Sequence, residues 1–368
     1  MMTSERLLRI AVLPGDGIGA EVTLAALPVF AALKIPVELC FGDIGWHFWE
    51  EEGTPIPART WDLIGQCDTT LLGAITSKPH QEAMQALSAK CRDKNRSYVS
   101  PIIQLRQKLR LFANVRPCFN IQKGTTLFDF CVIRENTEGL YAGFDYYPIP
   151  SQLLSLLENN PDWSTLPADE VSCTLRLQTK TGLTRLFVFA FEYALHHQMK
   201  NVTLADKPNV FRQSSHFVRT IFEAVAAQYP QITADILNVD AVALWMVRRP
   251  EMFDVIVAEN MFGDILSDVG AGVMGGLGLA PSANLGPDSC YFEPVHGSAP
   301  RIGRNKANPC AMFLTIGLLL EHFNYKNQAQ IIRDAVVKVV TSGQCVTYDL
   351  GGYASTQEMA QAILRAVS

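Results

Sequence analysis

The segment Asn260-Met-Phe-Gly-Asp-Ile-Leu-Ser-Asp268 follows an apolar run, Phe253-Asp-Val-Ile-Val-Ala258, that is typical of a buried strand. We expect a turn at Gly263 and a helix from about Asp264. Asp264 and Asp268 are four residues apart, so both carboxylates would point to one face of that helix. A cation between them would relieve their mutual repulsion, and oxygen ligands favour Mg²⁺ or Mn²⁺ over zinc. The spacing alone fits equally well a pair of solvated acids near a helix N-terminus.

Composition and length predict a soluble globular enzyme. The chain has 368 residues, which is enough for two domains. Of these residues, 48% are apolar and 18% are charged. The net charge of −5 gives no global basic surface, so we expect no nucleic-acid partner. Nine scattered cysteines without a Cys-x-x-Cys pair favour reduced thiols in a cytoplasmic protein. Residues 1–6 lack the apolar core of a signal peptide, and no apolar run reaches the roughly 20 residues that span a bilayer, so we expect no membrane partner.

Strand and helix patterns alternate along the chain, which predicts an α/β fold. A strand at residues 7–13 leads through Pro14-Gly-Asp-Gly-Ile-Gly19 into a helix at residues 20–32. The Gly-x-Gly-x-Gly spacing departs from the Gly-x-Gly-x-x-Gly of a Rossmann fold and favours a tight turn that needs glycine dihedrals. A second loop, Gly73-Ala-Ile-Thr-Ser77, follows the carboxyl end of a strand, where open α/β sheets place ligands.

Arginines are concentrated in two neighbouring segments. Arg106, Arg110 and Arg116 lie within residues 100–117, and Arg134 lies in Val132-Ile-Arg-Glu-Asn-Thr-Glu-Gly-Leu-Tyr141. Guanidinium groups bind carboxylates through two parallel hydrogen bonds, so a substrate with several carboxylates calls for several arginines. Taken singly, each of these residues is explained as well by a surface ion pair.

Three further polar residues stand at the ends of predicted elements. Tyr141 closes the second arginine segment, and a lone tyrosine is usually a core residue with a bonded hydroxyl. Lys207 follows a buried strand predicted at residues 202–205 and could simply be exposed to solvent. Asp240 ends a strand predicted at residues 236–240.

Several motifs together resemble those of the β-decarboxylating dehydrogenases, which include isocitrate, homoisocitrate, 3-isopropylmalate and tartrate dehydrogenases. They are Asn-Met-Phe-Gly-Asp-Ile-Leu-Ser-Asp, Leu-Phe-Ala-Asn-Val-Arg-Pro, Arg-Glu-Asn-Thr-Glu-Gly-Leu-Tyr, Asp-Lys-Pro-Asn-Val and Phe-Glu-Pro-Val-His-Gly-Ser-Ala-Pro. The resemblance implies a two-domain, isopropylmalate/isocitrate dehydrogenase-like α/β fold, not a Rossmann fold, with an intersubunit arm near residues 144–180. It places a large cofactor-binding domain at residues 1–98 plus 253–368 and a smaller dimerisation and substrate domain at residues 99–252.

The resemblance also implies a role for each site residue. A divalent metal would be held by Asp240, Asp264 and Asp268, and the malate carboxylates by Arg106, Arg116 and Arg134. The variable group of the substrate would contact Ser100, Ile102 and Ile103. Lys207 would be the general acid/base, and Tyr141 would return a proton in the final step. The cofactor would contact Ile18, Thr76, His296, Gly297, Ser298, Ala299, Arg301 and Asn308. Because family members share their sites, a homodimer is expected in which Lys207 and Asp240 cross to the neighbouring subunit.

The implied reaction is the oxidative decarboxylation of a 3-substituted (2R)-malate. Isocitrate or homoisocitrate is the leading substrate, because Ser100-Pro-Ile-Ile lacks the Glu and Leu pair usual in isopropylmalate enzymes; 3-isopropylmalate and tartrate or malate stay open. NAD is placed slightly ahead of NADP. Arg301 stands where NAD-dependent members carry Asp and suits a phosphate, whereas Ile302 and the Asp349-Leu-Gly-Gly tail are of the NAD type. A non-catalytic regulatory subunit is the alternative from another class, and the full set of predicted catalytic residues argues against it.

Overall fold

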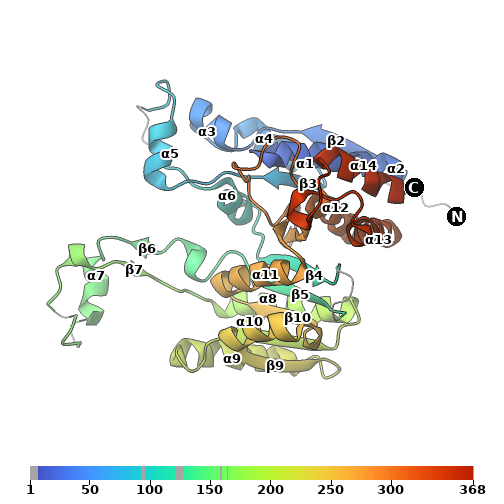
Figure 1. The fold of residues 1–368 in the computed structure, drawn as a ribbon. Helices are drawn as coiled ribbons and strands as arrows, with labels where there is room; N and C mark the ends of the chain where they lie inside the picture. Colours follow the sequence, from blue (N-terminus) through green and yellow to red (C-terminus); the bar gives the residue numbers. More distant parts are fainter. Residues whose placement is uncertain (1–6, 93–95, 122–126, 158–159, 164, 368) are drawn as a thin grey trace.

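The computed structural model describes residues 7–92, 96–121, 127–157, 160–163 and 165–367 (Figure 1). Residues 1–6, for which the absence of a signal peptide was predicted, lie outside the described part. The main sheet contains β1 (Leu8–Gly15), β2 (Val37–Phe41), β3 (Thr69–Ala74), β4 (Ala113–Phe119), β5 (Asp129–Glu135), β8 (Asn201–Asp206), β9 (Thr233–Asn238), β10 (Val255–Ala258), β11 (Pro281–Leu285) and β12 (Cys290–Pro294).

Within the described residues these strands form one ten-stranded sheet in the order β2-β1-β3-β12-β11-β4-β5-β10-β8-β9. The strands are parallel from β2 to β12 and again from β5 to β9. Between these two sets, β11 is antiparallel to both β12 and β4, and β4 is antiparallel to β5. This order differs from that of a Rossmann sheet. The predicted non-Rossmann α/β fold is therefore confirmed.

Helices cover both faces of the sheet. One face packs into a single large core with α1 (Ile18–Ala26), α8 (Lys180–His196), α9 (Arg212–Ala226), α12 (Cys310–His322), α13 (Lys326–Ser342) and α14 (Thr356–Val367). The other face packs against α4 (Ala58–Gln66), α6 (Pro101–Lys108), α10 (Val239–Arg248) and α11 (Asn260–Met274). The shorter helices are α2 (Pro28–Ala32), α3 (Trp46–Glu52), α5 (His80–Ala86) and α7 (Ser151–Leu154). Single 3₁₀ turns lie at Leu140–Ala142, Ser155–Leu157, Ala168–Glu170, Pro250–Met252, Leu277–Leu279 and Tyr348–Leu350.

Successive side chains of a strand point to opposite faces of the sheet, so each strand contributes residues to the cores on both faces. Ile10 and Val12 of β1 belong to the large core, whereas Ala11 and Leu13 belong to the core under α4 and α6. The turn after β1 has the predicted glycine conformations, because Gly15 has φ +72° and Gly17 has φ +55°.

Two local predictions were wrong. Helix α11 begins at Asn260, so Gly263 lies inside the helix and not in a turn. It is needed for packing, because a Cβ at position 263 would lie 2.7 Å from the Cβ of Arg134. Likewise, β9 ends at Asn238, and Asp240 lies in the first turn of α10 and not at the end of a strand.

A long excursion leaves the sheet where the arm was predicted, near residues 144–180. It contains the antiparallel pair β6 (Asp145–Tyr146) and β7 (Cys173–Thr174) together with α7, and it projects away from the layered body (Figure 1). The division into two domains stays a prediction. Strand β10, assigned to the 253–368 part, pairs with β5 and β8 of the 99–252 part. Among the described helices, none is long and apolar enough to cross a membrane.

Candidate active site

Two buried arginines, a third that is largely buried, and two partly exposed aspartates come together where α6, β4, β5 and α11 meet. The side chains of Arg106, Arg116 and Arg134 are 12%, 8% and 3% exposed, whereas those of Asp264 and Asp268 are 34% and 57% exposed. Arg134 forms an ion pair with Asp264, and Arg116 Nη1 lies 3.4 Å from Asp268 Oδ1 and 3.6 Å from Asp264 Oδ1. The arginines therefore line the floor of the site, and the aspartates stand at its rim.

Strand pairing sets this arrangement. On antiparallel β4 and β5, Asn114 is opposite Arg134, and Arg116 follows Asn114 by two residues, so all three share one face. The Nε of Arg116 donates to Asn114 Oδ1 at 2.7 Å, and its Nη1 donates to Ser267 Oγ at 2.6 Å. The Arg116 guanidinium is thus held from below by the sheet and from above by α11.

Beneath the arginines lies a buried polar network that the sequence did not reveal. Asn114 Nδ2 donates to Asn284 Oδ1 at 2.7 Å, and Asn284 Nδ2 donates to Glu293 Oε1 at 3.0 Å. Glu293 also accepts from the Tyr291 hydroxyl at 2.9 Å and lies 3.4 Å from Arg106 Nη2. Its members come from three neighbouring strands, and the alternation of polar side chains in Pro281-Ser-Ala-Asn284 was the only local signal.

The electrostatics of the site follow from burial and crowding. Burial lowers the pKa of Arg134, and the neighbouring cations Arg106 and Arg116 lower it further. Burial raises the pKa of Asp268, an effect that Arg116 opposes and Asp264 reinforces. Mutual repulsion among three guanidinium groups makes the site receptive to anions.

Tyr141 joins the same site from the 3₁₀ turn after β5. Its hydroxyl donates to Asp264 Oδ2 at 3.3 Å, and the guanidinium of Arg134 lies 5.5 Å from its ring centre. Burial and the charge of Asp264 raise its pKa, so the hydroxyl keeps its proton at neutral pH. A protonated phenol beside a substrate can act as a general acid.

Lys207 and Asp240 form a separate pair. Lys207 Nζ lies 2.5 Å from Asp240 Oδ1, and the Asp240 side chain is 68% exposed. Within the described residues, no group of three His, Cys, Asp or Glu side chains is arranged to hold a metal. The three predicted metal ligands therefore fall into two places in one chain: Asp264 with Asp268, and Asp240 with Lys207.

The predicted residues for the variable group lie at the start of α6. Ser100 Oγ lies 2.8 Å from Ser77 Oγ, which joins this helix start to the loop after β3. Ile102 is half-buried and Ile103 is exposed, and Arg106 follows Ile102 by one helical turn. A ligand held by Arg106 would therefore meet an apolar side chain next to it.

The loops predicted to hold the cofactor meet at one place. The N–H of Ile18 donates to the carbonyl of Ser298 at 3.1 Å, and Thr76 Oγ1 donates to Ser298 Oγ at 2.7 Å. Asp16, which the sequence did not single out, accepts from the N–H groups of Thr76 and Trp46, each at 2.8 Å. The Asp16 carboxylate thus joins the loops after β1, β2 and β3, and Ser298 joins the loop after β12 to them.

The remaining predicted cofactor residues follow β12. His296 Nε2 is buried without a hydrogen-bond partner among the described residues, and a Cβ at position 297 would lie 3.8 Å from the Ile75 carbonyl oxygen, an ordinary contact distance. Ala299 has φ +42°, and Asn308 Nδ2 donates to Asp349 Oδ2 at 2.9 Å. Arg301 lines a different cavity, of about 580 Å³, together with Arg304, Lys306, Tyr348 and Tyr353.

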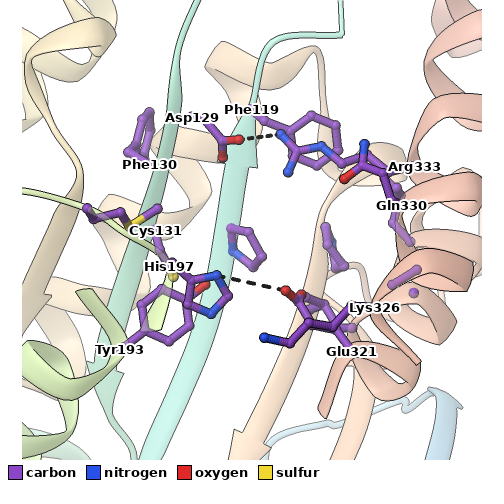
Figure 2. Close-up of a pocket in the computed structure, with 17 residues that line it drawn as sticks. Phe119, Asp129, Phe130, Cys131, Tyr193, His197, Glu321, Lys326, Gln330 and Arg333 are labelled. Carbon is purple, nitrogen blue, oxygen red and sulfur yellow. Dashed lines mark hydrogen bonds and ion pairs between the residues drawn. The ribbon is translucent and has the colours of Figure 1, made fainter. Parts of the chain in front are cut away.

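Another cavity, of about 180 Å³, lies on the opposite face of the sheet between α8, α12 and α13 (Figure 2). Two pairs of polar side chains face each other across it: Arg333 Nη2 lies 2.5 Å from Asp129 Oδ2, and His197 Nδ1 lies 3.8 Å from Glu321 Oε1. None of the predicted site residues lines it.

Comparison with known proteins identifies the family of the chain. Residues 9–363 match the family model described as isocitrate/isopropylmalate dehydrogenase. The chain belongs to this family. The family comprises β-decarboxylating dehydrogenases of hydroxy acids, which generally use NAD(P) and a divalent metal.

Curated relatives and solved structures match over almost the whole chain. Protein DlpA of Legionella pneumophila is 63% identical over 99% of this chain, which spans 59% of that relative's length. A 3-isopropylmalate dehydrogenase of Methanothermobacter thermautotrophicus is 40% identical over 97% of this chain and 98% of its own. The crystal structure of isocitrate dehydrogenase from Methylococcus capsulatus is similar with a TM-score of 0.84 at 35% identity, covering 98% of this chain and 99% of that one.

Replacing Arg134 with Met should weaken the binding of D-malate by about 30-fold or more, since a buried guanidinium lost from an anion site costs roughly 2–5 kcal/mol. Isothermal titration in saturating MgCl₂ measures the affinity. Arg110→Met is the matched control, because Arg110 is an exposed arginine just after the end of α6, in the neighbouring arginine segment. Equal affinities for the two variants would contradict the proposed floor of the site.

Proposed function

We propose that this chain oxidatively decarboxylates a 3-substituted (2R)-malate, with isocitrate or homoisocitrate as the leading substrate, NAD(P) as the hydride acceptor and a divalent metal. The observation that carries the proposal is the floor of three arginines facing Asp264, Asp268 and Tyr141. Guanidinium groups bind the carboxylates of a malate. The site has three arginines, and isocitrate has three carboxylates.

The donors fit Mg²⁺ or Mn²⁺. Asp264 and Asp268 offer carboxylate oxygens on one face of α11, and Asp240 offers a third on α10. When bound, the metal acidifies the substrate hydroxyl and stabilises negative charge that develops on oxygen. Lys207 would take the hydroxyl proton while hydride leaves for the nicotinamide. After loss of CO₂, the protonated Tyr141 hydroxyl would deliver a proton to C3.

A homodimer with shared sites would bring the two halves together. Asp240, Leu244 and Val247 lie on one face of α10, where Leu244 and Val247 are 54% and 63% exposed. On α11, Ile265 is 54% exposed one turn before the rim residue Asp268. Apolar exposure on both metal-ligand helices favours burial against a second copy, whose Lys207 and Asp240 would complete the site.

The loops after β1, β3 and β12 fit a dinucleotide. His296 Nε2 is free to bond adenosine, and Gly297 leaves room for close backbone approach. Arg301, Arg304 and Lys306 line one cavity without an acidic residue among its lining, which favours a 2′-phosphate and hence NADP. The sequence had placed NAD slightly ahead, and NAD use stays the alternative.

The substrate's variable group is the least constrained part of the proposal. Ser100, at the start of the helix that carries Arg106, offers a hydroxyl to a third carboxylate, which keeps isocitrate and homoisocitrate ahead. Ile102 and Ile103 on the same helix start favour 3-isopropylmalate as the second candidate, and the Methanothermobacter relative carries that name. Tartrate or malate stays open, as does a non-catalytic regulatory subunit, against which the complete set of candidate residues argues.

The purified chain should turn over one member of a panel of isocitrate, homoisocitrate, 3-isopropylmalate, tartrate and malate only when Mg²⁺ or Mn²⁺ is present. Reduction of NAD or NADP gives kcat/KM for each. Asp264→Asn should lower metal-dependent turnover by about 10³-fold or more, because it removes a charged ligand. Metal-independent activity would sink the assignment, and a tenfold preference for isopropylmalate, about 1.4 kcal/mol, would reverse the substrate order.

Mixing two inactive variants, Lys207→Ala and Asp264→Asn, should restore activity if sites are shared between subunits. In a two-fold dimer, random exchange gives half mixed molecules with one intact site each, so about a quarter of the wild-type activity is expected. Native mass spectrometry verifies that subunits have exchanged. No recovery after verified exchange would show that each site uses residues of one chain.

Arg301→Asp tests the cofactor assignment. If the guanidinium binds a 2′-phosphate, kcat/KM for NADP should fall by about tenfold or more while that for NAD holds or rises. Arg219→Asp is the control for the change in net charge, because Arg219 is exposed on α9 and no residue of that helix lines this cavity. An unchanged NADP/NAD ratio would mean that Arg301 does not contact the cofactor.

A further inference from the structure

Arg176 lies at the base of the arm, between β7 and α8, and its side chain turns inward so that only 10% of it is exposed. Its Nη2 lies 3.1 Å from Asp206 Oδ1, and its Nε lies 3.9 Å from Glu259 Oε2. The guanidinium carbon lies 4.9 Å from the ring centre of Phe211 and 5.3 Å from that of Phe262. One side chain thus contacts two acids and two aromatic rings.

Two of these neighbours flank Lys207. Asp206 is the last residue of β8 and directly precedes Lys207, and its side chain is 4% exposed. The N–H of Phe211 donates to the carbonyl of Lys207 at 3.0 Å, which closes the turn that carries the lysine. Arg176 therefore contacts this turn on both sides of Lys207.

The other two neighbours form the start of α11. Glu259 caps the helix, because its Oε1 accepts from the N–H of Phe262 at 3.1 Å. The same helix presents Asp264 and Asp268 at the rim of the arginine site. The direction of the first turn of α11 therefore depends on groups that Arg176 touches.

The cluster is held by charge and ring contacts and not by a closed hydrogen-bond network. Among the residues that the structure describes, none provides a hydrogen-bond partner for the buried Nε and Nη1 of Arg176 or for Oε2 of Glu259. Asp206 and Glu259 are both nearly inaccessible, at 4% and 3% side-chain exposure, and Arg176 supplies the cation between them. Buried unpaired donors and acceptors are costly, and a native structure retains them where the position of a group matters.

We propose that Arg176 is a positioning residue of the reaction, which joins the turn carrying Lys207 to the helix start carrying Asp264 and Asp268. This role rests on the proposed function. In the proposed dimer, Lys207 serves the partner's site while Asp264 and Asp268 serve the chain's own. Arg176 would then connect half of one active site to half of the other.

The test compares Arg176→Met and Arg176→Lys with wild type, and uses Arg333→Met as the matched control. Arg333 also combines an ion pair, with Asp129, and a ring contact, with Phe119 at 3.7 Å, but it lies on the opposite face. Arg176→Met should lower kcat by about 100-fold, because a misplacement of about 1 Å has that effect, while KM changes by less than about threefold. The arginines that bind substrate are untouched, which is why KM should hold.

Arg176→Lys keeps the charge in a group too compact to contact both carboxylates, so kcat should fall by about tenfold while the thermal midpoint stays near that of wild type. This variant decides the question if Arg176→Met does not fold. A kcat within twofold of wild type in a folded variant, or an equal loss in Arg333→Met, would overturn the proposal. An inactive wild-type chain would instead overturn the proposed function, and this role with it.

Subunit mixing then tests the effect of Arg176 on Lys207 and on Asp264 separately. Paired with Lys207→Ala, the Arg176→Met chain must supply Lys207; paired with Asp264→Asn, it must supply Asp264. Both mixtures should be at least tenfold less active than the mixture of Lys207→Ala with Asp264→Asn. Impairment of only one mixture would show that Arg176 supports one half-site alone, and the proposed connection would be wrong.

Discussion

The ion pair between Arg134 and Asp264 requires α11 to lie almost in contact with β5. A guanidinium cannot shed its charge in a protein, so burying three of them demands fixed partners for each. The contact is possible because Gly263 has no side chain where the stem of Arg134 passes beneath the helix. Asn114 fixes the neighbouring Arg116 from the sheet side, at 2.7 Å. The orientation of the whole site therefore depends on how closely one helix approaches one pair of strands.

Local sequence predicted the elements well where they depend on local chemistry. The glycine conformations after β1 and the strands at residues 202–205 and 253–258 follow from turn residues and apolar runs. Gly263 was misread because glycine usually interrupts a helix, whereas its reason here is the distant Arg134. Asp240 was misplaced because apolar residues continue past Asn238 without a break in pattern.

The site was predictable as a set of residues but not as an arrangement. The resemblance named the arginines and acids, and the structure brings Arg106, Arg116, Arg134, Tyr141, Asp264 and Asp268 together. The amide and carboxylate network of Asn114, Asn284 and Glu293 was missed, since its members meet only through sheet pairing. Lys207 and Asp240 lie apart from the other site residues. Local sequence patterns could not predict this separation, because it is a property of the whole fold.

The separation of these groups bears on how ligands would bind. In the chain alone, the carboxylates of Asp264, Asp268 and Glu293 face Arg134, Arg116 and Arg106, so the charges nominally balance. A divalent cation shared by Asp264 and Asp268 would compete with Arg116 and Arg134 for the same oxygens. Arginines that lose their aspartate partners to the cation would bind most favourably to a ligand that supplies carboxylates of its own. Metal and substrate should therefore favour each other's binding, and by linkage the preference is reciprocal. A substrate with fewer carboxylates would leave a buried guanidinium without a partner, and this cost discriminates against it more strongly than any loss of apolar contact.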